Sequence, residues 1–322
     1  MVRDDGTSQT GGTALVLSGG GAKGAFQLGA LEALADAGFG TAGRPYARVA
    51  GTSVGALNGA MVAAGRGPGG TNALGELWRS IGARDVFRKR SIPALLLHGL
   101  LWKLGLRRHG PLGLYSNAPL RALIERYLGD CPRFEVPFSA GRVDLHTGVY
   151  ESEVHPGTPH FVDEILASTA IPVTWPPVWI DGHPFVDGGV REITPLGDIV
   201  AHEPDRVILI TTERRAKEWM NERPEHLLDV AQQTIPVLVD NTFAGDLDLY
   251  LTINRAAQQV EALGGTFTDA AGRAYRAYET LFIAPAEPLG DGLDFTRAAL
   301  DRRIEEGYGA TLRALEATGW EA

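Results

Sequence analysis

The chain has 322 residues, of which 44% are hydrophobic, and its 30 Lys plus Arg against 39 Asp plus Glu give a formal net charge of −9. This length and apolar content suffice for one large domain or two small ones with a full-sized core, and they exclude a chain that is disordered throughout. The negative charge argues against a nucleic-acid partner, because a general binder needs clustered Lys and Arg to neutralise phosphates.

Cysteine content and targeting patterns favour the cytoplasm. Cys131 is the single cysteine and has no partner for an internal disulfide, and no Asn-x-Ser/Thr sequon occurs. Residues 1–12 are polar and predict a flexible tail, and the apolar run that follows is too short for a signal peptide. No run approaches the ~18 apolar residues that span a bilayer, so we expect a cytoplasmic protein that at most touches a membrane surface.

The first half of the chain predicts a strand, a glycine turn and a helix twice in succession. Residues 14–17 form a short apolar run that ends in glycines, and apolar residues from 26 to 35 recur at helical spacing. Residues 46–50, 51–55 and 56–64 repeat the plan. This alternation predicts an α/β fold with a mainly parallel sheet, whose ligands bind at the carboxyl ends of the strands.

The rest of the chain predicts one domain over residues 13–322, with the motifs in 13–212 and a mostly helical completion in 213–322. Prolines near residues 172 and 176 predict irregular backbone there. Helices are expected over 73–81, 161–168, 227–240, 247–263 and 296–317, and strands over 207–211 and 280–284.

Residues 88–109 combine leucines with basic residues. No acid lies between Asp85 and Glu125, and the Leu-rich stretch 92–106 contains Trp102. Two interpretations remain open. The stretch is either an ordinary core helix with solvated ends, or an interfacial cover over the active site that contacts anionic membrane.

The pattern Gly-x-Ser-x-Gly occurs where a predicted strand meets a predicted helix. It comprises Gly51, Thr52, Ser53, Val54 and Gly55. Small flanking residues allow a turn sharp enough to expose the serine, with a helix amino terminus behind it. This setting favours a nucleophilic serine over an ordinary tight turn.

A second glycine-rich turn follows the first predicted strand. It comprises Gly19, Gly20, Gly21, Ala22, Lys23 and Gly24. The pattern Gly-x-Gly-x-x-Gly also suits a dinucleotide site, but the acid expected about 20 residues later is missing, and a Walker A lysine is missing too. Unhindered backbone N–H groups at a helix start can instead stabilise an oxyanion. The two turns together therefore favour acyl transfer.

A serine nucleophile needs a base, and two candidates differ in their context. His202 fits the chain order of an α/β-hydrolase, but nothing around it marks a site. Asp187 precedes Gly188 and Gly189, which would let another turn approach a carboxylate closely. An ordinary Asp-Gly turn is the better explanation of that tripeptide when it is taken alone.

Together, these motifs resemble the signatures of patatin-like phospholipases. The first glycine turn, the serine turn and Asp187-Gly188-Gly189 occur in the family's order, and residues 167–172 and 176–177 extend the agreement to roughly residues 13–212. The resemblance implies a three-layer α/β/α fold and a Ser-Asp dyad without histidine. Carried over, Ser53 is the nucleophile, Asp187 is the base, and the amides of Gly19 to Gly21 form the oxyanion hole. Lys23 stands where many members have arginine.

The sequence thus predicts a serine acyl hydrolase that acts on lipid esters, with phospholipase A or lysophospholipase-like activity. It predicts no cofactor and no metal, because Cys131 and the eight scattered histidines show no ligand spacing. Two alternatives stay open. One is a non-catalytic lipid-binding or regulatory protein on the same fold, and the weaker one is a dinucleotide-binding oxidoreductase.

Overall fold

The computed structural model describes residues 12–106, 112–213, 227–270 and 272–320. Residues 1–11 of the expected tail lie outside this range, as do Arg107 and Arg108.

An eight-stranded mixed sheet forms the centre of the molecule. Its order is β12 (Glu279–Ile283), β9 (Arg206–Ile210), β1 (Thr13–Leu17), β2 (Arg48–Thr52), β5 (Phe138–Asp144), β8 (His183–Asp187) and β7 (Val178–Ile180), with β6 (Tyr150–Glu153) also on β5. Neighbours from β12 to β5 are parallel, and β6, β7 and β8 join by antiparallel pairing. The expected mainly parallel sheet is confirmed.

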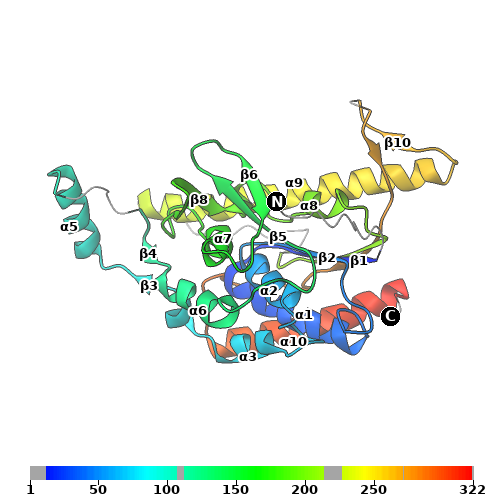
Figure 1. Cartoon of the computed structure of the whole chain (residues 1–322), viewed down its shortest axis with the longest axis horizontal. Coiled ribbons are helices and arrows are strands. Elements are labelled where there is room, and N and C mark those ends of the chain that lie inside the picture. The colour runs from blue at the N-terminus through cyan, green and yellow to red at the C-terminus, as the bar shows by residue number, and fades with distance from the viewer. Residues whose placement is uncertain (1–11, 107–111, 214–226, 271, 321–322) are drawn as a thin grey trace.

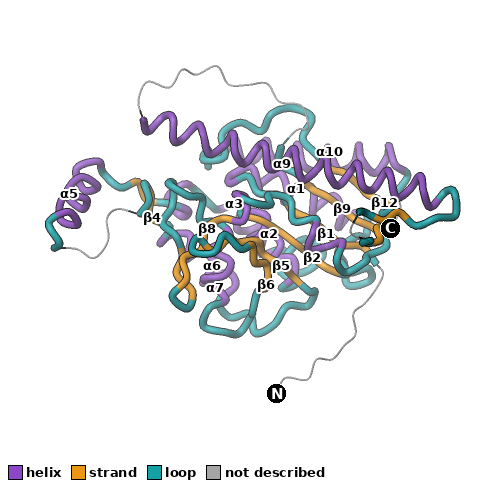
Figure 2. Tube along the Cα trace, turned by 90° about the horizontal axis from the view of Figure 1, so that it is seen from above, coloured by secondary structure: helices purple, strands orange, loops and turns teal. Residues whose placement is uncertain are grey.

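Helices cover both faces of the sheet. Leu15 and Leu17 of β1 pack in one core with α1 (Gly24–Asp36), α2 (Val54–Ala63) and α10 (Arg297–Thr318). Ala14 and Val16 pack in a second core with α8 (Gly197–Val200) and α9 (Leu227–Glu261). Alternate side chains of a strand point to opposite faces, so an entirely apolar strand needs a helix layer on each side. Figures 1 and 2 show the resulting three-layer α/β/α arrangement.

The remaining elements are short. They are η1 (Gly21–Lys23), α3 (Ala73–Ser80), α4 (Ala83–Val86), β3 (Arg88–Lys89), α5 (Ile92–Lys103), β4 (Tyr115–Ser116), α6 (Ala118–Leu128), α7 (Phe161–Ser168), η2 (Gly188–Val190), β10 (Phe267–Thr268) and β11 (Ala274–Tyr275).

The prediction of two helices over 227–240 and 247–263 is wrong, because α9 runs unbroken through the expected gap. Phe243, Leu247 and Tyr250 are buried in the second core. Packing of these side chains against the sheet stabilises the helix where local propensity is weak.

Of the two interpretations left open for residues 92–106, the ordinary core helix is wrong. The helix forms as α5, but most of its apolar side chains that the structure describes are exposed, with Leu96 at 69% and Trp102 at 54%. At 12 residues α5 is short, and no helix in the described part of the chain is both long and apolar enough to span a bilayer.

Candidate active site

Ser53 lies at a sharp turn between β2 and α2. Its backbone has φ 58° and ψ −124°, a conformation that side chains rarely adopt and that is typical of a nucleophile elbow. Glycine is required on both sides, since a Cβ on Gly51 would lie 2.1 Å from the Gly55 oxygen, and a Cβ on Gly55 would lie 2.2 Å from the Leu17 oxygen. The strand continues through Thr52, two residues beyond the predicted end, so the turn is confined to the serine itself.

Strand β5 brings Asp187 to the serine. Thr52 of β2 pairs with Gly141 of β5, and the next residue of β5, Arg142, pairs with Asp187 of β8. The chain is closely packed at this point, because a Cβ on Gly188 would lie 2.5 Å from the backbone of Gly141. Asp187 and the residue just before Ser53 therefore pair with adjacent residues of β5. This pairing brings the two predicted catalytic residues together, although 134 positions separate them in the sequence.

The Asp187 carboxyl is 2% exposed and incompletely hydrogen-bonded. Its Oδ1 accepts a hydrogen bond from the Gly189 N–H at 2.8 Å, whereas Oδ2 is buried and accepts none from the residues that the structure describes. Burial disfavours the ionised form and raises the pKa of Asp187 to about 7, while the Gly189 N–H and the Ser53 hydroxyl act in the opposite direction. Asp187 is therefore a carboxyl that exchanges its proton near neutral pH.

The first glycine turn leaves two amides without an acceptor. The Gly19 N–H donates to the Ile193 oxygen at 3.3 Å, and the Ala22 N–H donates to the Gly292 oxygen at 2.7 Å. Within the described ranges no acceptor takes the N–H of Gly20 or Gly21. A Cβ on Gly19 would lie 3.1 Å from the Ser53 Cβ, so this turn sits directly beside the serine. Of the three amides expected to form the oxyanion hole, Gly20 and Gly21 are the two available ones.

Buried polar side chains support the glycine turn from behind. Trp78 Nε1 donates to Asn58 Oδ1 at 2.9 Å, Asn58 Nδ2 donates to Gln27 Oε1 at 2.8 Å, and Gln27 Nε2 donates to the Ser18 oxygen at 2.7 Å. Sequence analysis missed this chain of hydrogen bonds. Its signal is the presence of two amide side chains, Gln27 and Asn58, among the small and apolar residues of α1 and α2.

Two further polar contacts fix the site. The Ser53 N–H donates to Ser168 Oγ at 3.1 Å, which ties the serine turn to the end of α7. Ser168 lies in the segment 167–172 that matched the family, yet sequence analysis gave it no role. Lys23 forms an ion pair with Glu213, just beyond β9, and this holds the glycine turn from its other side.

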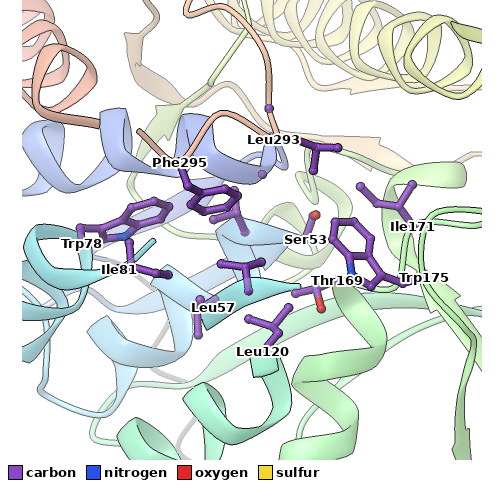
Figure 3. Close-up of a pocket in the computed structure, with 14 residues that line it drawn as sticks. Ser53, Leu57, Trp78, Ile81, Leu120, Thr169, Ile171, Trp175, Leu293 and Phe295 are labelled. Carbon is purple, nitrogen blue, oxygen red and sulfur yellow. The ribbon is translucent and has the colours of Figure 1, made fainter. Parts of the chain in front are cut away.

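An apolar pocket of about 490 Å³ opens at Ser53. Leu57, Trp78, Ile81 and Leu120 lie to one side of the serine and are almost fully buried. On the other side Ile171, Trp175 and Leu293 line the pocket, and Ile171 and Leu293 are only half-buried, which marks the open end (Figure 3).

Histidines do not take part in this arrangement, but they are less scattered than expected. No described histidine lines the pocket or hydrogen-bonds to Ser53 or Asp187, and that includes His202. The expectation that the histidines form no cluster is wrong, because Asp144, His146 and His183 bring ligand atoms within 4.8 Å of one another. Asp144 accepts hydrogen bonds from the His146 N–H and the Thr147 hydroxyl and contacts His183 Nδ1 at 3.0 Å.

Comparisons with known proteins match this chain to two solved structures and to one protein family. Two solved structures are similar: VipD from Legionella pneumophila, at 16% identity and a TM-score of 0.43, and human GIVD cytosolic phospholipase A2 in complex with methyl gamma-linolenyl fluorophosphonate, at 13% and 0.39. They cover 96% and 99% of this chain, which spans 67% and 61% of theirs. The sequence model of the patatin-like phospholipase family matches residues 15–200, more than half of the chain, and includes both glycine turns, Ser53 and Asp187. The chain belongs to the patatin-like phospholipase family.

Proposed function

We propose that this protein is a serine acyl hydrolase that cleaves carboxyl esters of lipids, with Ser53 as nucleophile and Asp187 as base. Membership of the family supports lipid hydrolase activity. The observation that carries the finer assignment is the juxtaposition of an elbow serine with a buried carboxyl whose pKa is about 7. An ordinary aspartate is a weak base, whereas a pKa near the working pH suits general base catalysis and removes the need for histidine.

The reaction proceeds through an acyl-enzyme. Ser53 Oγ attacks the ester carbonyl as Asp187 Oδ2 takes its proton, and the amides of Gly20 and Gly21 stabilise the negative oxygen of the tetrahedral intermediate. Collapse of the intermediate releases the alcohol, which receives the proton from Asp187. Water then attacks the acyl-enzyme as Asp187 takes one of its protons. The bond from the carbonyl carbon to Ser53 Oγ breaks, Ser53 Oγ receives the proton from Asp187, and the carboxylic acid leaves.

The pocket supports an acyl chain as the group beside the reacting carbonyl. Its closed end is lined by Leu57, Trp78, Ile81 and Leu120, which offer apolar surface for a hydrocarbon. The open end near Ile171 leaves room for the alcohol portion of the ester. Phospholipids and lysophospholipids are the ester class that combines a long acyl chain with a polar alcohol portion, and phospholipase A or lysophospholipase activity follows.

A fluorophosphonate probe tests the nucleophile directly, because it labels activated serines and spares inert ones. We expect one labelled peptide, containing Ser53, and loss of the label in Ser53→Ala and in Asp187→Asn. Ser80→Ala, at a serine on α3 outside the pocket, is the matched control and keeps the label. A folded protein that hydrolyses no p-nitrophenyl ester and takes no label would be a non-catalytic lipid-binding member of the family.

The pH profile tests the base. We expect kcat/KM to rise with pH through about 7, as Asp187 loses its proton. Asp187→Asn and Ser53→Ala should each abolish nearly all turnover, and the double variant should be little worse, since the two groups act in one step. Retained activity in Asp187→Asn, with loss in His202→Ala or His183→Ala, would replace the dyad by a histidine mechanism.

A further inference from the structure

The segment formed by β3, α5 and β4, here called the arm, projects from the body of the protein. Figures 1 and 2 show α5 at one end of the molecule, away from both helix layers. No described residue of α5 lines the pocket. The arm is therefore an element whose apolar residues are not accounted for by the core or by the substrate pocket.

The arm exposes apolar side chains on nearly every side. Leu96 is 69% exposed, Leu100 53% and Trp102 54%, and Leu104 and Leu106 continue the surface beyond the helix. A helix that is apolar all round is expected in a core or in contact with lipid, and clustered exposed apolar side chains mark a contact surface. At ~1.5 Å per residue α5 is about 18 Å long, too short to cross a bilayer but sufficient to lie in its interface.

Positive charge accompanies this apolar surface. Arg88, Lys89 and Lys103 are exposed and form no ion pair with a described residue. No acid occurs from residue 86 to residue 124, in a chain whose net charge is −9. A surface with unneutralised cations beside exposed leucines is complementary to anionic lipid, where phosphates meet acyl chains.

The base of the arm is built into the wall of the pocket. The Tyr115 N–H donates to the Thr174 oxygen at 2.9 Å, and the Tyr115 ring stacks on Phe87 at 5.0 Å between centroids. Both rings also contact Trp175, which lines the pocket. A lipid surface bound to the arm would therefore lie near the open end of the pocket.

We propose that the arm docks the protein on the surface of an anionic lipid aggregate and presents the open end of the pocket to it. This inference rests on the proposed function for the choice of a lipid surface. A second copy of the chain is disfavoured as the occupant, because two arms packed together would bring Arg88, Lys89 and Lys103 of both copies into proximity. The negative charge of the remainder of the protein favours the orientation in which the arm faces the anionic surface.

Vesicle co-sedimentation of the full chain, in a Ser53→Ala background that prevents hydrolysis, tests the docking. We expect binding to vesicles of phosphatidylcholine with phosphatidylglycerol, weak binding to phosphatidylcholine alone, and a loss of affinity at high salt. The triple variant Arg88→Glu/Lys89→Glu/Lys103→Glu should bind at least about a hundredfold more weakly, at roughly fivefold for each charge removed. Leu96→Gln/Leu100→Gln, which keeps helix propensity, should also weaken binding.

Matched controls separate the arm from total charge and total hydrophobicity. Arg133→Glu/Arg255→Glu/Arg302→Glu changes the net charge equally at exposed positions elsewhere, and Leu249→Gln/Leu312→Gln removes exposed leucines elsewhere. Both controls should bind like the parent. Vesicle binding by the arm variants that equals binding by the parent overturns the proposal. If the arm variants also lose self-association while their vesicle binding is unchanged, the arm contacts a second copy of the chain and not a lipid surface.

A second assay distinguishes failure of this inference from failure of the proposed function. With Ser53 restored, the arm variants should hydrolyse soluble p-nitrophenyl butyrate normally and anionic phospholipid vesicles more slowly. Vesicle binding without any esterase activity would contradict the proposed function and leave the docking intact. Unchanged hydrolysis of both substrates by the arm variants would contradict the docking alone.

Discussion

At the scale of single residues, the burial that suits Asp187 to the proposed role of base also makes its carboxyl costly to ionise. The carboxyl is enclosed near Gly189 and Ser53, and its Oδ2 accepts no hydrogen bond from the described residues that would stabilise the charge. Its pKa of about 7 places the folded protein in both protonation states near neutrality. Ionisation of Asp187, which the proposed mechanism requires, should therefore lower the stability of the folded protein.

The stability of the wild-type protein should fall relative to Asp187→Asn as the pH rises. The pKa of Asp187 is 3.8 in an ordinary setting and about 7 in the fold, so the folded state binds the proton more tightly than the unfolded state. Its stabilising contribution is complete below about pH 4 and is lost as the pH rises through 7. Glu192 and Asp246, whose pKa values burial also raises, to about 7 and about 6, are common to both proteins and cancel in the difference.

Urea unfolding of both proteins at about pH 5 and about pH 9 measures this difference. We expect Asp187→Asn to gain in relative stability at the higher pH. Glu305→Gln, at an exposed position on α10, is the control and should show no such pH dependence. A wild-type protein that gains stability relative to Asp187→Asn with rising pH would contradict the raised pKa.

Gly20→Ala should lower kcat about a hundredfold, the effect of one lost oxyanion donor. Gly20 has φ 150°, and its Cβ would lie 2.2 Å from Thr212 Oγ1, so the substitution must turn the amide. Gly148→Ala is the matched control, because Gly148 also has positive φ (70°) but open space around it. Both variants should lose stability, by roughly 1–2 kcal/mol from backbone strain alone, and only Gly20→Ala should lose kcat. Equal kcat values would remove Gly20 from the oxyanion hole.

At the scale of elements, the loop before α10 contributes residues to the candidate site, although all of the sequence motifs lie before residue 190. Gly292 accepts the Ala22 N–H, and Leu293 and Phe295 line the pocket. Arg303 of α10 is fully buried, and its guanidinium donates to the backbone oxygens of Leu289, Asp291 and Asp294. Helix α10 thus fixes a loop that in turn contacts the first glycine turn.

Arg303→Met should lower kcat at least tenfold, since one guanidinium holds three carbonyls and an apolar side chain leaves them buried without a donor. KM for a short soluble ester should change less, because the loss falls on the position of the oxyanion amides. Arg303→Lys should restore part of kcat by supplying one or two donors. The exposed Arg302→Met is the control. Equal thermal destabilisation by Arg303→Met and Arg303→Lys without any change in kcat would confine Arg303 to the fold.

At the scale of the whole molecule, the pocket beside Ser53, where we propose that the acyl chain binds, is assembled from segments distant in the chain. Leu57 comes from α2, Ile81 follows α3, Leu120 belongs to α6 and Phe295 precedes α10. Each is an ordinary apolar residue in its local sequence. Chain-length preference is consequently a property of how these elements pack.

Ile81→Phe should shorten the preferred acyl chain. Ile81 lies at the closed end of the pocket (Figure 3), so a larger ring takes up space that a long chain would fill. We expect kcat/KM for long-chain p-nitrophenyl esters to fall about tenfold or more, with the butyrate ester nearly unaffected. Leu312→Phe, on α10 outside the pocket, should change neither. An equal loss for both ester lengths would place the acyl chain elsewhere.

Local pattern was sufficient to predict the first half of the sheet and the chemistry of the turns. Each of three local patterns reports a local requirement. The apolar run at β1 reports an enclosed strand, the glycines around Ser53 report a tight turn, and the helical spacing of α1 reports a helix packed in the core. Lipid ester hydrolysis was predicted from three such segments and their order. These features are encoded within a few residues, so they are readable in one sequence.

Strand β5 was not predicted, and only the tertiary structure decided its role. Its sequence Phe-Ser-Ala-Gly-Arg-Val-Asp mixes polar, charged and small residues, yet all seven are buried because β2, β6 and β8 surround it. The proximity of Ser53 and Asp187, the available amides of Gly20 and Gly21, and the raised pKa of Asp187 all depend on that packing. The exposure of α5 is likewise a tertiary outcome, because an apolar helix has the same local pattern whether it packs in a core or stands outside it. The sequence by itself determined the family motifs and predicted which groups react. Burial and strand pairing are long-range, and they decided which of these groups lie together and how strongly Asp187 holds its proton.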